Sequence, residues 1–192
     1  MTKMPPGPRS GRNASLTRER ILAAARRYFS LHGYDHVGTR DIAREAGADA
    51  ALVNRYFGSK EELFREVITG GFLVEEHLPE DLADFGSFLV SQVLDNKSEP
   101  DDFDALRVLL RAADSPAIAA LVAERFDEEF IRPLARRLGG RDAEVRATLI
   151  ASYVLGLATM RYGFEARSLS GAPGRKASVL AEKAIQACAT PA

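Results

Sequence analysis

The chain has 192 residues, 46% of them apolar and 28% charged, and a formal net charge of −1 at pH 7. This length and composition allow a sizeable buried core and suffice for one domain plus a smaller one. A single cysteine, Cys188, excludes an internal disulfide framework, and the sequence has neither a signal-peptide core nor an apolar run of bilayer length. We therefore expect a cytoplasmic protein without a membrane span.

Basic residues are concentrated near the N-terminus. Residues 1–58 contain ten Lys and Arg against five Asp and Glu, a net charge of +5, whereas the remainder carries 16 basic and 22 acidic residues, a net charge of −6. A positive end on an otherwise acidic chain is typical of a module that binds a polyanion. Chance variation in a short segment is the alternative interpretation.

The first 14 residues predict a basic arm without a core. They contain three prolines, two glycines and three basic residues, a composition that favours disorder. Arg9 and Arg12 then either contact nucleic-acid phosphates or belong to a passive tail.

A helix is predicted from Thr17 to His32, where apolar residues recur at every third or fourth position, and Gly33 ends it. His32 and His36 have the spacing of two metal ligands on one helix. However, Gly33 separates them and no cysteine or acidic partner is evident, so we predict no metal site.

Residues 39–60, TRDIAREAGADAALVNRYFGSK, predict two short helices joined by a tight turn. Thr39 is a good N-cap for the first helix, whose apolar stripe contains Ile42, Ala43 and Ala46. Gly47 ends this helix, because glycine adopts the left-handed conformation without steric cost.

The second short helix, residues 50–57, is predicted to begin after a capping Asp49 and to end at Gly58. Its large apolar residues should dock it against the rest of the protein, and they are Leu52, Val53, Tyr56 and Phe57. The opposite face would present two small residues, an amide and a guanidinium to base edges, and it consists of Ala50, Ala51, Asn54 and Arg55. Ser59 should cap the next helix.

That next helix is predicted to continue to about Val74 despite Gly70 and Gly71, a pair that marks a soft or closely packed point. Further helices are expected over residues 82–93, 103–113, 115–138, 142–164 and 175–189. In the third of these, Ser115 caps the start and Pro133 removes a backbone donor, which predicts a kink or local break near Glu129. Asp142 is expected to cap the fourth.

The last two predicted helices favour a dimer. Residues 142–164 are apolar on more than one face, so a second surface must cover them. Two helices from each of two chains would form a four-helix seam, in which small residues allow close approach. These small residues are Ala151, Gly156, Ala158 and Ala181. The alternative is that both helices cap the core of a monomer.

An apolar ligand pocket is the least specific prediction, since each of its candidate residues fits an ordinary core equally well. The set comprises Phe103, Leu106, Leu110, Phe126, Phe130, Tyr153 and Met160. Its composition favours an apolar or aromatic small molecule over a highly charged one.

The sequence contains no phosphate-binding glycine loop, serine-nucleophile motif or zinc-protease motif, so we expect neither catalysis nor a cofactor. A helical protein-interaction module without specific DNA binding is the alternative to a DNA-binding regulator. Affinity for duplex DNA that falls with salt distinguishes the two.

Three consecutive segments resemble the DNA-binding domain of the tetracycline-repressor (TetR) family of bacterial transcription regulators. They are ILAAARRYFSLHG at residues 21–33, TRDIAREAG from Thr39, and ADAALVNRYFGSKEELF, and the similarity covers about residues 15–65. The resemblance implies an all-helical homodimer with a three-helix helix-turn-helix domain at residues 15–60. Residues 61–192 would then form a helical domain that dimerises and binds a small molecule, which releases a repressor from its operator.

The resemblance also implies the role of each residue at the DNA. Arg40, Ala50, Ala51, Asn54 and Arg55 would face bases. Thr39, Tyr56 and Lys60 would hold phosphates. Asn54 departs from the aromatic residue often found at its position in the family, which leaves the base preference open.

Overall fold

The computed structural model describes residues 8–73, 78–94, 104–112 and 115–190, and of residues 8–12, 172 and 173 it describes the backbone alone. Every regular element in these ranges is helical, which confirms the predicted all-α fold class. The chain forms two compact units, one up to Thr69 and the other built from the described residues after it. The first unit therefore extends past the predicted domain boundary at residue 60.

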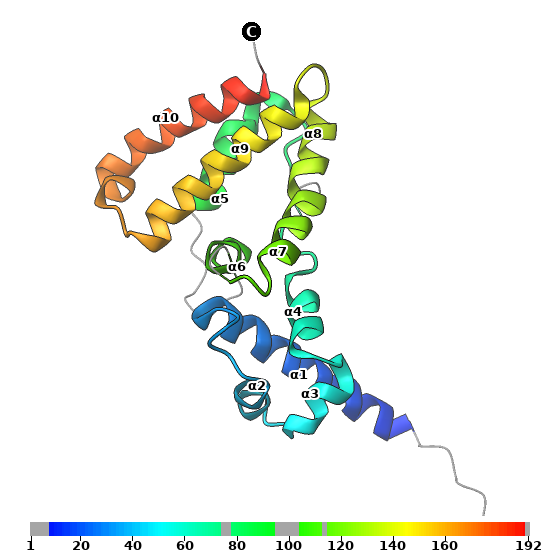
Figure 1. Cartoon of the computed structure of the whole chain (residues 1–192). Coiled ribbons are helices and arrows are strands. Elements are labelled where there is room, and N and C mark those ends of the chain that lie inside the picture. The colour runs from blue at the N-terminus through cyan, green and yellow to red at the C-terminus, as the bar shows by residue number, and fades with distance from the viewer. Residues whose placement is uncertain (1–7, 74–77, 95–103, 113–114, 191–192) are drawn as a thin grey trace, which may run out of the picture. The chain divides into compact units, whose positions relative to one another are not determined.

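The N-terminal unit consists of four helices, drawn in blue to cyan in Figure 1. They are α1 (Pro8–His32), α2 (Thr39–Glu45), α3 (Ala50–Phe57) and α4 (Lys60–Ile68). Helix α1 packs against the other three. Apolar side chains spaced at three and four residues meet in the centre, where the rings of Phe29 and Phe64 lie edge to face with centroids 5.1 Å apart.

Helix α1 begins earlier than predicted. Residues 8–14, expected to be disordered, continue the helix, and residues 1–7 of the predicted arm lie outside the described residues. Pro8 suits a first helical position, since the N–H that proline lacks would have no partner there. The side chains of Arg9 and Arg12 also lie outside the described residues.

Helix α4 ends at Ile68, whereas we predicted that it continues to Val74, which lies outside the described residues. Thr69 is extended, with φ −62° and ψ 127°, and Gly70 has φ +75°. The left-handed conformation of Gly70 turns the chain out of the helix at a position where other residues are strained.

The C-terminal unit contains the remaining helices, of which α5, α9 and α10 pack against one another (Figure 1). Its α-helices are α5 (Phe85–Leu94), α6 (Ala105–Ala112), α7 (Ala119–Phe126), α8 (Arg132–Leu138), α9 (Ala143–Ala158) and α10 (Gly171–Ala189). Short 3₁₀ turns, η1 (Leu82–Asp84) and η4 (Arg167–Leu169), precede α5 and α10. The side chains of Phe85, Ile150 and Ile185 are fully buried in this core.

The break predicted near Glu129 is confirmed. A single π-helical turn, η2 (Asp127–Ile131), joins α7 to α8, and its closing bond runs from the Arg132 N–H to the Asp127 carbonyl. Pro133 offers no N–H, so the helix cannot keep its regular pattern across this point. A second π turn, η3 (Thr159–Gly163), follows α9.

Three predicted helix starts differ from the structure. Helix α7 begins at Ala119 because residues 115–118 form a turn, in which the Ser115 carbonyl accepts from the Ile118 and Ala119 N–H groups. Asp142 precedes α9, yet its left-handed backbone (φ 56°) turns the side chain away from a capping bond. Helix α10 begins at Gly171, four residues before the predicted start.

Helices α5 and α10 approach each other closely at Gly86 of α5. A Cβ atom added there would overlap the Glu182 carbonyl oxygen of α10 and lie 3.2 Å from the Gln186 Cβ. The Gln186 side chain also fixes the contact, since it accepts from the Gly86 N–H at 3.0 Å and donates to the Leu82 carbonyl at 2.8 Å. Glycine at this position therefore sets the separation of the two helices.

We predict that Gly86→Ala lowers the free energy of unfolding by about 1–3 kcal/mol, the usual cost of overpacking a core. Chemical denaturation measures the change. The neighbouring exposed Ser87→Ala serves as control and should stay within about 0.5 kcal/mol of the parent chain. Equal stability of both variants would contradict close packing at Gly86.

Candidate functional site

Capping residues define the limits of α3. The Asp49 carboxylate accepts from the Ala51 N–H at 2.7 Å, and Gly58 ends the helix with φ +82°. Ser59 caps α4 by accepting from the Glu62 N–H at 3.0 Å. The Asp49 cap and Gly58 confirm the predicted start and end of α3, and Ser59 confirms the predicted start of α4. Each lies at a helix end, where backbone groups lack partners within the helix.

The inner face of α3 holds the helix against the unit. Val53 and Phe57 are buried, whereas Leu52 and Tyr56 are half-buried. The Arg18 guanidinium of α1 lies over the Phe57 ring, 4.7 Å from its centroid, and forms an ion pair with Glu66 at 2.6 Å. Burial of this face determines which residues of α3 point outward.

The outer face of α3 is free. Ala51, Asn54 and Arg55 are exposed, and Ala50 is half-buried. The side chains of Asn54 and Arg55 make no hydrogen bond or ion pair with any described residue. An amide and a guanidinium without internal partners are available for an external ligand with acceptor atoms.

Helix α2 begins one residue earlier than predicted. Gly38 is its N-cap, and the Asp41 carboxylate accepts from the Gly38 N–H at 3.2 Å, so Thr39 is the first helical residue. Asp41 supplies from the first turn the capping bond expected from Thr39. Arg40 is exposed and lacks a partner among the described residues, whereas Arg44 is bound to Asp41 at 2.8 Å.

Several other arginines of this unit are held by acids. Arg27 pairs with Glu45, and Arg65 lies 3.4 Å from Glu61. Arg20 of α1 is exposed and has no partner in the described part of the chain, and sequence reasoning did not single it out. Its place directly before Ile21, a residue of the predicted apolar stripe, could have indicated that the Arg20 side chain points outward.

Lys60 is partly enclosed at the start of α4. Its Nζ lies over the Tyr34 ring, 4.0 Å from the centroid, a cation–π contact. Partial burial lowers the pKa of Lys60, and the nearby Asp35 carboxylate opposes this change. Burial also raises the pKa of Tyr34, with the charges of Glu61 and Asp35 adding to the effect.

The C-terminal unit contains a cavity of about 300 Å³. Leu106, Phe126 and Phe130 of the predicted ligand set line it. Leu110 does not, and Phe103 lies outside the described residues. Tyr153 and Met160 do not line this pocket; they are 43% and 45% exposed on α9 and η3, where they line a separate shallow groove.

Sequence reasoning missed the other half of the cavity. Gly70, Gly71, Phe72 and Leu73, which directly follow α4, line one side. Helix α5 contributes mainly apolar residues and one amide, and these are Phe88, Leu89, Gln92 and Val93. The early end of α4 explains the omission, because a helix continued to Val74 would turn these residues differently.

Large apolar side chains remain exposed on the outer sides of α9, η3 and α10. On α9 and η3 they are Val145, Leu149, Tyr153 and Met160, followed by Phe164, and on α10 they are Val179 and Leu180. The α9 residues repeat at intervals of four, so they form one stripe along the helix. Exposed apolar area of this kind typically marks a surface that another molecule covers.

Two further findings concern the described residues alone. No group of three or more histidine, cysteine or acidic side chains is arranged to hold a metal ion there. None of the helices in these ranges combines the length and apolarity that a bilayer span requires.

Two family patterns match the chain. The family described as "Bacterial regulatory proteins, tetR family" matches residues 21–67. The family described as "Tetracyclin repressor-like, C-terminal domain" matches residues 83–188, more than half of the chain. Together they cover both structural units.

Individual relatives are also regulators. A TetR-family regulator of Streptomyces coelicolor A3 has a crystal structure 30% identical in sequence, with a TM-score of 0.56 over 98% of this chain and 99% of its own. The putative mycofactocin biosynthesis transcriptional regulator MftR of Mycobacterium tuberculosis is 25% identical over 83% of this chain and 84% of its own length. The regulator BetI of Agrobacterium fabrum is 49% identical over 53 residues, which span 28% of this chain and 26% of BetI.

We predict that Asp49→Ala lowers the free energy of unfolding by about 1 kcal/mol, the usual cost of losing an N-cap. Urea denaturation of the parent chain and the variant measures this loss. Asn54→Ala on the exposed face of the same helix is the matched control, with a change below about 0.5 kcal/mol. A loss at Asn54 as large as that at Asp49 would contradict the capping role.

Proposed function

Because the chain belongs to the TetR family and is a DNA-binding transcription regulator, we propose that it acts as a homodimeric repressor which a small molecule releases from its operator. The observation that carries the DNA-binding part is the free outer face of α3, with Arg55 and Asn54 exposed and without partners among the described residues. Binding without catalysis is the proposed activity.

Helix α3 is the proposed reading element. Its eight residues span about 12 Å, comparable with the width of the B-DNA major groove. Ala50 and Ala51 are small enough to let the backbone approach base edges. Arg55 has the geometry for a bidentate contact with guanine O6 and N7, and Asn54 for a contact with adenine.

Residues around α3 complete the proposed interface. Arg40, exposed at the start of α2, joins the base-facing group, while Thr39, Tyr56 and Lys60 hold phosphates. Tyr56 is half-buried and the Lys60 ammonium lies over the Tyr34 ring, which supports a positioning role for both beside the reading helix. The operator would contain two half-sites separated by about one helical turn or a multiple of it.

Dimerisation through α9 and α10 is the proposed use of the exposed apolar stripe. Leu180 is 69% exposed on α10, and Val145 is 60% exposed on α9. Gly156 and its surroundings form a shallow groove on α9 with no atom within 4 Å of an added Cβ, which would allow close approach of a second copy. A twofold axis would bring the same helices of both chains together.

The proposed effector occupies the cavity of the C-terminal unit. Its volume of about 300 Å³ is at the lower end of the range for small-molecule sites. The lining is apolar and aromatic, and the exposed Gln92 amide has no hydrogen-bond partner among the described residues. An uncharged apolar or aromatic compound with one hydrogen-bonding group fits this lining best.

Selection of bound duplexes from a random oligonucleotide pool tests the function as a whole. A specific regulator should enrich a sequence with two related half-sites, and its affinity should fall steeply with salt. A helical interaction module would enrich none.

With the selected operator in hand, we predict that Arg55→Ala costs about 1–3 kcal/mol of binding free energy on that sequence and little on random DNA, as expected for a guanine contact. Lys60→Ala should instead weaken binding to all sequences alike and reduce the salt slope by about one. Fluorescence anisotropy at several salt concentrations measures both effects. Equal loss on operator and random DNA would refute base reading by Arg55.

We also predict that Leu180→Glu separates the dimer into monomers, because a carboxylate in an apolar seam is left without a partner. Sedimentation velocity measures the change in mass, and circular dichroism checks that the helices remain. Leu16→Glu, at a 52% exposed leucine of α1, is the control and should stay dimeric. A Leu180→Glu protein that dimerises as tightly as the parent chain would rule out this seam.

A further inference from the structure

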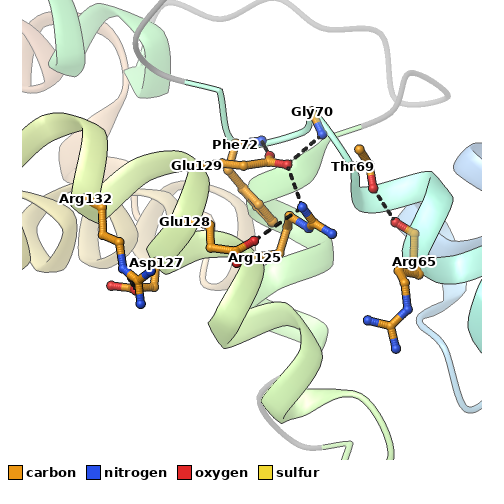
Figure 2. A network of polar contacts seen from close by, with 9 residues as sticks. All are labelled: Arg65, Thr69, Gly70, Phe72, Arg125, Asp127, Glu128, Glu129 and Arg132. Carbon is orange, nitrogen blue, oxygen red and sulfur yellow. Dashed lines mark hydrogen bonds and ion pairs between the residues drawn. The ribbon is translucent and has the colours of Figure 1, made fainter.

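Glu129 is a buried carboxylate whose partners lie in the segment directly after α4. Its side chain, in the π turn η2, accepts from the Gly70 N–H at 2.9 Å and from the Phe72 N–H at 3.1 Å (Figure 2). The residue is only 7% exposed. Burying a charge is costly unless hydrogen bonds compensate it, so these two backbone donors and the carboxylate depend on each other.

The same segment forms one wall of the proposed effector cavity. Gly70, Phe72 and their neighbours line it on one side, and Phe126 and Phe130, which flank Glu129 in sequence, line it on another. The Phe72 ring lies edge to face with Phe126, with centroids 5.5 Å apart, and Phe126 stacks on Phe130 at 5.0 Å. Phe72 is thus held by its N–H on Glu129 and by its ring on the cavity wall.

A ligand seated in this open pocket would contact both of these walls, and the two walls differ in how firmly they are held. Phe126 and Phe130 belong to a continuous helical rod that packs into the core, where both are buried. The segment from Gly70 to Phe72 forms a turn outside the helices, and Gly70 has a left-handed backbone. Displacing this segment should therefore require less free energy than displacing the wall that contains Phe126 and Phe130.

A second partner of Glu129 lowers the energetic cost of losing the two backbone hydrogen bonds. The Arg125 guanidinium lies 3.7 Å from Glu129 and 3.4 Å from Glu128, one turn earlier on the same rod (Figure 2). If the two N–H groups depart, Glu129 keeps a cation as neighbour rather than remaining an unpaired buried charge. Loss of the two backbone bonds would therefore leave Glu129 with a charged neighbour, which a switch between two states at this point requires.

We propose that Glu129 is a latch: it holds the segment Gly70–Phe72 when the cavity is empty, and ligand binding in the cavity breaks its two hydrogen bonds to that segment. Because Gly70 directly follows Thr69, the last residue of the DNA-binding unit, release of the latch frees the covalent connection between ligand and DNA-binding units. This inference rests on the effector cavity proposed above. It adds the residue that senses whether the cavity is occupied.

Hydrogen exchange of the Gly70 and Phe72 amides, followed by NMR in the full-length chain, tests the latch without a ligand. A glutamine at position 129 offers one acceptor oxygen where two N–H groups need one each. Glu129→Gln should therefore accelerate exchange at these amides about ten- to a hundred-fold, the range for lost bonds to a charged acceptor. Glu128→Gln, which alters the exposed partner of Arg125, should leave exchange unchanged. Equal protection in Glu129→Gln and the parent chain would overturn the proposal.

The parent chain itself supplies the second test. N-phenyl-1-naphthylamine is a neutral aromatic probe whose fluorescence rises on entering an apolar cavity, and at saturation it should accelerate exchange at Gly70 and Phe72 and change affinity for the selected operator. The probe should still bind Glu129→Gln, but operator affinity with the probe should then be nearly equal to operator affinity without it.

The possible failures are distinguishable. Absence of probe binding would overturn the effector cavity and the latch with it. Probe binding with unchanged exchange at both amides would overturn the latch alone. If the parent chain does not bind the operator even before the probe is added, that result would count against the DNA-binding proposal.

Discussion

Burial of Val53 and Phe57 is the constraint on which the N-terminal unit depends. These two side chains fix the rotation of α3, so that Asn54 and Arg55 on its other side meet solvent. An eight-residue helix has little stability of its own, so packing and the Asp49 cap must hold it. The proposed base-reading surface therefore depends on a small apolar contact together with a single capping bond.

The arginines of the N-terminal unit also favour α2 and α3 as the proposed DNA-binding surface. Several arginines are paired internally with acids, as Arg18 is with Glu66 and Arg27 with Glu45, and these pairs link helices. Exposed pairs of this kind contribute little stability individually. Arg40 and Arg55, which lack such partners among the described residues, retain their full hydrogen-bonding capacity for the proposed contacts with DNA.

Local chemistry explains what the sequence could predict. Asp49, Gly58 and Ser59 act through bonds to residues two to four positions away, so their roles can be read directly from the chain. The break caused by Pro133 is local in the same sense. Predictions became wrong where a distant residue decides: the end of α4 depends on a glycine whose N–H bonds to Glu129, 59 positions away. The cavity depends on that same turn, which explains why Phe72 was missed.

The account as a whole depends on α3 reading bases in the major groove. Methylation interference on the selected operator tests this most directly, because methyl groups at guanine N7 lie in the major groove and those at adenine N3 in the minor groove. The account predicts that N7 methylation of a guanine in each half-site blocks the parent chain, and that Arg55→Ala becomes insensitive to methylation at that guanine. Interference confined to adenine N3, or equal N7 interference with both proteins, would contradict it.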